Sequence, residues 1–79
     1  YILYDLGTVY ALLKDYTRAK EYYDRATKLN SKIAEVYYNR GLIEMALNHK
    51  SEALRDLGIA GELGLYDAYA LIKQISMHK

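Results

Sequence analysis

The chain has 79 residues, with 11 basic and 10 acidic side chains, two histidines, and no cysteine, proline, tryptophan or phenylalanine. This length suits one small domain, the lack of cysteine excludes disulfides and thiolate metal sites, and the net charge of +1 argues against nucleic-acid binding, which needs clustered Lys and Arg. No apolar run approaches the roughly 20 residues that a membrane-spanning helix needs, so we expect no membrane insertion.

Apolar residues recur at helical spacing along the whole chain, and polar turns interrupt them four times. We predict helices over residues 1–13, 18–29, 34–47, 51–63 and 67–78. Asp15 is a candidate N-cap of the second helix and Ser31 of the third. Gly64 follows the fourth helix at a C-cap position. The predicted fold class is therefore all-α.

The sequence repeats itself with an offset of 34 residues. The identical pairs are Tyr4/Tyr38, Gly7/Gly41, Leu13/Leu47, Ala19/Ala53, Ala26/Ala60, Leu29/Leu63 and Ala34/Ala68. All of these residues are apolar, small or aromatic, whereas charged positions change between the copies, as Arg18 and Glu52 do. We expect two repeats, residues 1–33 and 34–67, and a terminal capping helix, 68–79, because the last packed face of a repeat stack would otherwise be left in water.

Residues at corresponding packing positions of the two copies resemble the signature of the tetratricopeptide repeat at its 34-residue period. They are Leu6, Gly7, Tyr10, Ala19, Tyr23 and Ala26 in the first copy, and Tyr37, Gly41, Ala53, Leu57 and Ala60 in the second. The resemblance implies a right-handed solenoid of helical hairpins, from the C-terminal portion of a repeat protein. The sequence departs from the family pattern at Arg40 and Glu44, where an apolar residue and an aromatic are usual.

Glycines within the predicted helices need a compensating contact, because each costs roughly 0.5–1 kcal/mol relative to alanine. At Gly7 and Gly41 we expect the partner helix of each hairpin to approach closely, with Ala19 and Ala53 as the opposing surfaces. The later series Gly58, Gly61 and Gly64 is spaced by three residues. It predicts a flat side on which tyrosines of the last helix pack, or else local flexibility.

In the resembling family, the first helices of successive hairpins line a concave groove. The positions that this resemblance assigns to the groove are Tyr4, Thr8, Tyr38, Asn39, Leu42, Met45, Tyr69, Ile72 and Lys73. They are mostly aromatic and aliphatic, and tyrosine and methionine suit a recognition surface. We expect the aromatics and Leu42 to anchor a protein or peptide, with Asn39 and Lys73 donating hydrogen bonds. Tyr10, Tyr23 and Tyr37 are instead predicted to be core residues.

Two further patterns have competing interpretations. Arg40 and Glu44 lie four residues apart, so we expect an ion pair between them or a network with Arg55 or Asp56, while a charged hot spot for a partner is the alternative. Some members of the resembling family bind the C-terminal carboxylate of heat-shock chaperones. Asn39 and Lys73 fit that pattern, but Tyr4, Thr8 and Tyr69 do not, so this role is not predicted.

The sequence predicts no catalytic residue, cofactor or metal site. His49 in a turn and His78 near the end of the chain lie too far apart to share an ion, neither has the i,i+4 spacing of a helical zinc site, and no glycine-rich phosphate loop is present. We therefore predict a non-catalytic scaffold that binds a protein or peptide. The alternatives are a self-assembly element, its groove filled by another copy or by preceding repeats, or the non-catalytic arm of a larger enzyme or sensor.

Overall fold

The computed structural model describes residues 2–77, and every regular element within them is a helix. The helices are α1 (Ile2–Leu12), α2 (Tyr16–Leu29), α3 (Ala34–Ala46), α4 (Lys50–Glu62) and α5 (Asp67–Met77). The predicted all-α fold is confirmed, and the helix ends that were expected within the described residues lie within two residues of their expected positions. The expected ends at residues 1 and 78 lie outside the described residues. Among the described helices, none combines the length and apolar character needed to cross a bilayer.

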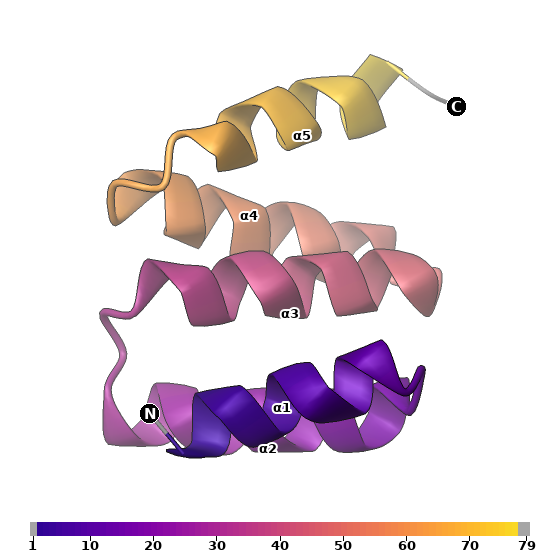
Figure 1. The fold of residues 1–79 in the computed structure, drawn as a ribbon. Helices are drawn as coiled ribbons and strands as arrows, with labels where there is room; N and C mark the ends of the chain where they lie inside the picture. Colours follow the sequence, from indigo (N-terminus) through magenta and orange to yellow (C-terminus); the bar gives the residue numbers. More distant parts are fainter. Residues whose placement is uncertain (1, 78–79) are drawn as a thin grey trace.

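The helices stack as two hairpins and a final single helix. Figure 1 shows α1 and α3 side by side in one layer, α2 and α4 behind them, and α5 at the end of the stack. Within each hairpin α1 packs on α2 and α3 on α4, while α2 against α3 and α4 against α5 join successive units. Each unit therefore contacts its neighbours in the chain, as in a repeat stack.

The turns that close the hairpins share one backbone conformation. Lys14 and Asn48, 34 residues apart, have φ values of 62° and 63°, in the left-handed region that satisfies the last carbonyls of a helix. Gly64 takes the same place after α4 with φ 110°. The predicted N-cap at Asp15 is confirmed, because its carboxylate accepts a bond of 3.3 Å from the backbone N–H of Arg18.

The N-cap predicted at Ser31 is wrong. Ile33 holds the N-cap position of α3 and makes no side-chain capping bond. The chain is extended at Asn30, whose side-chain oxygen accepts from the Lys32 N–H at 3.0 Å. The carbonyl of Ser31 instead accepts from the Tyr37 hydroxyl at 3.0 Å. This bond ties the connection between the hairpins to α3.

Most of the buried apolar residues form two clusters, and α3 contributes to both. The first cluster contains Ala19, Tyr23, Ala26, Val36 and Ile43. The second contains Tyr37, Leu57, Ala60 and Ala68. The core assignment is confirmed for Tyr23 and Tyr37, which are 1% and 8% exposed. Tyr10 is half-buried and packs against the first cluster.

The close approach predicted at the repeated glycines is confirmed, but the opposing residues differ from those expected. A Cβ on Gly7 would lie 2.6 Å from the ring of Tyr23, and a Cβ on Gly41 would lie 2.9 Å from Cγ of Leu57. Ala53 offers only its carbonyl oxygen, at 3.4 Å. In each hairpin, the second helix thus places a large side chain where the Cβ of the glycine position would lie. This residue, Tyr23 or Leu57, follows the expected alanine by four positions.

The glycines of α4 differ from one another. A Cβ on Gly61 would lie 2.6 Å from the ring of Tyr69, so the predicted flat surface for a tyrosine of the last helix is confirmed there. Around Gly58 nothing lies within 4 Å of the same added atom. Gly61 is therefore required by packing, whereas Gly58 has no such requirement.

The last helix packs through a different face from the helix one repeat earlier. Val36 and Ile43 of α3 are 0% and 4% exposed. The residues 34 positions later, Ala70 and Met77, are both exposed. α5 instead buries Ala68 completely, and Leu71, Ile72 and Ile75 pack against the second cluster. The packing face of α5 includes Ile75, which stands at the position where the earlier repeats have Gly7 and Gly41.

The glycine contacts give a first prediction. Gly7→Ala should lower the free energy of unfolding by about 1–3 kcal/mol, because the fully buried Tyr23 ring must move. Gly58→Ala should raise it by about 0.5–1 kcal/mol, since alanine favours the helix and meets no neighbour. Urea denaturation followed by circular dichroism measures both. Equal effects of the two substitutions would contradict the packing explanation.

Candidate functional site

The predicted groove contains a hollow between the first helices of the two hairpins, here called the interhelical hollow. It is lined by Thr8, Ala11, Leu12, Tyr23, Asn39, Leu42 and Ile43, and has a volume of about 210 Å³. Three of these residues, Thr8, Asn39 and Leu42, are among those predicted from the sequence. Leu42 is 43% exposed and Leu12 is 79% exposed, so apolar side chains at the hollow are accessible to a partner.

Two side-chain hydrogen bonds hold the walls of the interhelical hollow. The hydroxyls of Thr8 and Tyr23 are 2.9 Å apart and join α1 to α2. Asn39 Nδ2 donates to the hydroxyl of Tyr4 at 2.9 Å and joins α3 to α1. Burial raises the pKa of Tyr23, and its bond to Thr8 only partly opposes that rise. The Asn39 amide retains a carbonyl oxygen that can accept a hydrogen bond from a ligand.

The other predicted groove residues lie further along the stack. Tyr38 and Ile72 are half-buried and pack against the second core cluster. Met45 is half-buried, and Lys73 is exposed. Tyr69 is 47% exposed, contacts α4 through Gly61, and stacks on Tyr66 with ring centroids 6.4 Å apart. The structure therefore brings Tyr4, Thr8, Asn39 and Leu42 together, and holds Tyr69 against α4.

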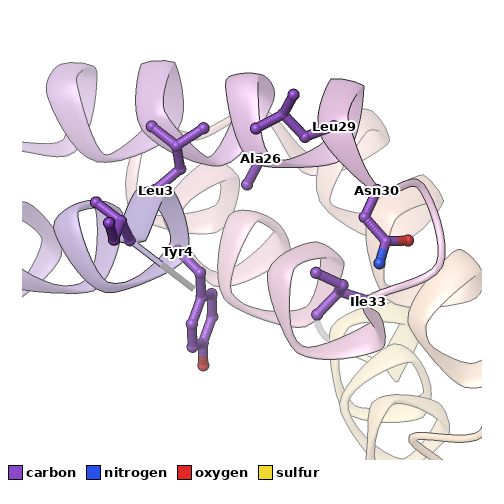
Figure 2. A pocket seen from close by; sticks show the side chains of 7 residues that line it. Leu3, Tyr4, Ala26, Leu29, Asn30 and Ile33 are labelled. Carbon is purple, nitrogen blue, oxygen red and sulfur yellow. The ribbon is translucent and has the colours of Figure 1, made fainter.

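A second apolar pocket, the end pocket, opens where α1 begins and α2 ends. Figure 2 shows Leu3, Tyr4, Ala26, Leu29, Asn30 and Ile33 around it, and Ile2 completes the lining. Its volume is about 190 Å³. Sequence reasoning selected only Tyr4 of this set for recognition. Because the Tyr4 hydroxyl also holds Asn39, this side chain links the end pocket to the interhelical hollow.

The charged residues that depart from the family pattern form a network on the other side of α3. The guanidinium of Arg40 donates two bonds of 2.9 Å to the carboxylate of Asp56 and one of 2.9 Å to Asp24. It also lies 5.2 Å from the centre of the Tyr37 ring. Burial lowers the pKa of Arg40, but the two carboxylates outweigh burial and raise it overall. The predicted contact with Asp56 is confirmed.

Glu44 takes different partners from Arg40, so the two do not pair with each other. One oxygen of the buried Glu44 carboxylate lies 3.3 Å from Nζ of Lys20, and the other lies 3.0 Å from Nδ1 of His49. Glu52 Oε2 is 3.7 Å from the same imidazole nitrogen. A polar surface hollow lies beside these residues, and Arg55 is part of its lining.

Glu44, His49 and Glu52, here called the His49 cluster, offer three ligand atoms within 4.8 Å of one another. Sequence reasoning missed this cluster because it tested histidines for i,i+4 ligands on a single helix. Here the ligands come from the end of α3 and the start of α4, on both sides of a tight turn. The sequence pattern that could have indicated the cluster is a glutamate five residues before His49 and another three residues after it. His78 lies outside the described residues.

Comparison with known proteins supports the repeat assignment. Residues 1–33 match the tetratricopeptide repeat family. Over 52 residues the chain is 36% identical to Photosystem I assembly protein Ycf3 of Acaryochloris marina (strain MBIC 11017). The matched part covers 66% of this chain and 30% of that protein. The chain thus spans less than a third of the length of this relative.

Breaking the buried ion pair gives a second prediction. Arg40→Leu should lower the free energy of unfolding by about 3–5 kcal/mol, because it leaves the carboxylate of Asp56, whose side chain is 6% exposed, without its cation. The double variant Arg40→Leu/Asp56→Leu should recover part of that loss, since no unpaired buried charge remains there. Urea denaturation of both variants tests this. A double variant no more stable than Arg40→Leu would contradict it.

The environment of Tyr23 gives a third prediction. The pKa of the Tyr23 hydroxyl is raised in the folded state, so the folded chain binds this proton more tightly than the unfolded chain does. The protonated hydroxyl therefore stabilises the fold, and this stabilisation should be lost as the pH rises above about 10, the usual pKa of tyrosine. Tyr23→Phe should cost about 1 kcal/mol at neutral pH through the lost bond to Thr8. Above pH 10 its stability should decline less steeply than that of the control Tyr66→Phe, whose ring is 73% exposed. Parallel declines would contradict the prediction.

Proposed function

We propose that this chain, which belongs to the tetratricopeptide repeat family, is a non-catalytic scaffold that binds a protein or peptide segment in the groove along α1, α3 and α5. Tetratricopeptide repeats generally mediate protein–protein interaction. The observation that carries the proposal is the interhelical hollow, where apolar side chains remain accessible above hydrogen-bonded walls.

The geometry suggests how such a segment binds. An apolar side chain of the partner enters the interhelical hollow and contacts Leu42 and Leu12, which lose exposed area. The bonds from Thr8 and Asn39 already fix the walls, so little ordering is required on binding. The carbonyl oxygen of the Asn39 amide accepts a hydrogen bond from the backbone of the segment, and Lys73 contacts a polar or acidic group further along.

The relative points to the kind of partner. That protein is named for the assembly of photosystem I. By this likeness, the partner of the present chain is a subunit of a multiprotein complex, bound while the complex is being assembled. Accessible apolar side chains suit this task, because subunits that are not yet assembled expose apolar surfaces.

A second candidate function, the self-assembly element, is favoured by the outer face of α1. Ile2 and Val9 are 79% and 50% exposed, whereas the residues 34 positions later, Val36 and Ile43, are 0% and 4% exposed. The second hairpin therefore buries a face that the first leaves uncovered. Another helical hairpin, from a second copy or a preceding repeat, fits this face.

A peptide selection with a matched pair of variants tests the binding function. Peptides selected from a random library against the chain should bind Leu42→Glu at least tenfold more weakly, because the variant places a charge at the apolar hollow. Leu63→Glu is the control, since Leu63 has a similar exposure, 38%, at the end of α4. Fluorescence anisotropy measures affinity, and circular dichroism verifies folding.

Equal binding to the two variants would contradict the groove as the binding site. Sedimentation equilibrium of the unmodified chain at rising concentration separates the second candidate. Dimers that Val9→Glu dissociates and Leu42→Glu does not would favour self-assembly through α1. A monomer at all concentrations would count against self-assembly.

A further inference from the structure

We propose that the His49 cluster binds one divalent transition-metal ion, with Glu44 Oε1, His49 Nδ1 and Glu52 Oε2 as ligands. Zinc prefers imidazole nitrogen and carboxylate oxygen at about 2.0–2.2 Å. Two ligand atoms on a tetrahedral ion are then about 3.4 Å apart. The observed separations of 3.0 Å from Glu44 to His49 and 3.7 Å from His49 to Glu52 lie on either side of this value.

Two of the three ligands are held in place by the fold. The side chain of Glu44 is 3% exposed, and Lys20 binds its second oxygen at 3.3 Å, which leaves the first oxygen facing His49. The backbone N–H of His49 donates to the Glu44 carbonyl at 2.7 Å, and the His49 carbonyl accepts from Ala53 at 2.9 Å. Glu52, with 53% of its side chain exposed, is free to adjust its rotamer to the ion.

The first hairpin provides an internal comparison. At the positions 34 residues earlier it has Tyr10, Asp15 and Arg18. There Arg18 lies 5.6 Å from the centre of the Tyr10 ring and 3.6 Å from the carboxylate of Asp15. The first hairpin thus forms the same left-handed turn without a set of metal ligands. The turn therefore does not require the three ligand residues that the second hairpin has.

The comparison also shows a difference in charge between the two turns. In the first hairpin a permanent cation, Arg18, occupies the position that the second hairpin gives to Glu52. The His49 cluster has two carboxylates and an imidazole, and Lys20 neutralises one of the carboxylates. A bound cation would lie between His49 and Glu52, where the first hairpin has its guanidinium.

The ligand set indicates the class of ion and its effect. An imidazole favours zinc and other late first-row metals over calcium and magnesium, which prefer oxygen ligands alone. Three protein ligands leave at least one position for water on a tetrahedral ion. The ion would connect the last turn of α3 to the first turn of α4, and so hold the second hairpin closed at its turn.

The test is a zinc titration of the purified chain in competition with a chromophoric chelator, together with visible absorption of the cobalt complex. We expect one zinc per chain. His49→Gln and Glu52→Gln should each weaken binding at least tenfold. Two matched controls, His78→Gln at the other histidine of the chain and Glu62→Gln at an exposed acid of α4, should bind as the unmodified chain does.

Zinc binding that His49→Gln leaves unchanged, or that His78→Gln abolishes, would overturn the proposal. So would the absence of binding at 1:1 stoichiometry. Leu42→Glu, which alters only the interhelical hollow, should bind zinc normally, so the outcome is independent of the proposed groove function. Circular dichroism of each variant distinguishes loss of a ligand from loss of the fold.

Discussion

The fold depends on the absence of a side chain at Gly7 and Gly41. At each of these positions a large residue of the partner helix, Tyr23 or Leu57, occupies the place of the missing Cβ. The helices of a hairpin can then approach closely, and the alanines Ala19 and Ala53 become fully buried. The cost of glycine in a helix is thereby offset by packing. Helix separation in turn sets the position of Thr8, which binds the hydroxyl of Tyr23 beneath the interhelical hollow.

The second hairpin has charged residues at two positions where the first has an aliphatic and an aromatic residue. Leu6 and Tyr22 of the first copy become Arg40 and Asp56, which form a nearly buried bidentate pair. Such pairs contribute little net stability compared with apolar side chains, because both charges lose hydration. Their directional bonds do fix α3 relative to α2 and α4, since Arg40 also reaches Asp24. The departures from the repeat pattern thus serve to position α3.

The sequence was sufficient to predict the helices, the repeat and the close approach at the glycines, because each leaves a periodic or local signal. Whether Tyr23 or Ala19 would face Gly7 depends on the rotation of α2 about its own axis, which a one-dimensional pattern does not determine. The position of Tyr69 depends likewise on the altered face of α5. The His49 cluster was missed because its members lie on two helices whose relative placement is set by the left-handed Asn48. Whether the groove residues bind a partner is a question of chemistry that neither spacing nor fold decides.

The sharing of α3 between the two core clusters has a consequence for folding. Val36 and Ile43 complete the first cluster and Tyr37 belongs to the second, so neither cluster is whole without this helix. The hairpins are therefore coupled, and loss of α3 from one cluster exposes the other. Most of the packing joins helices that are adjacent in the chain. Only short loops must therefore close during folding, and the entropic cost of closing them is small. From this arrangement we expect rapid nucleation through local contacts and a single unfolding transition that includes both hairpins.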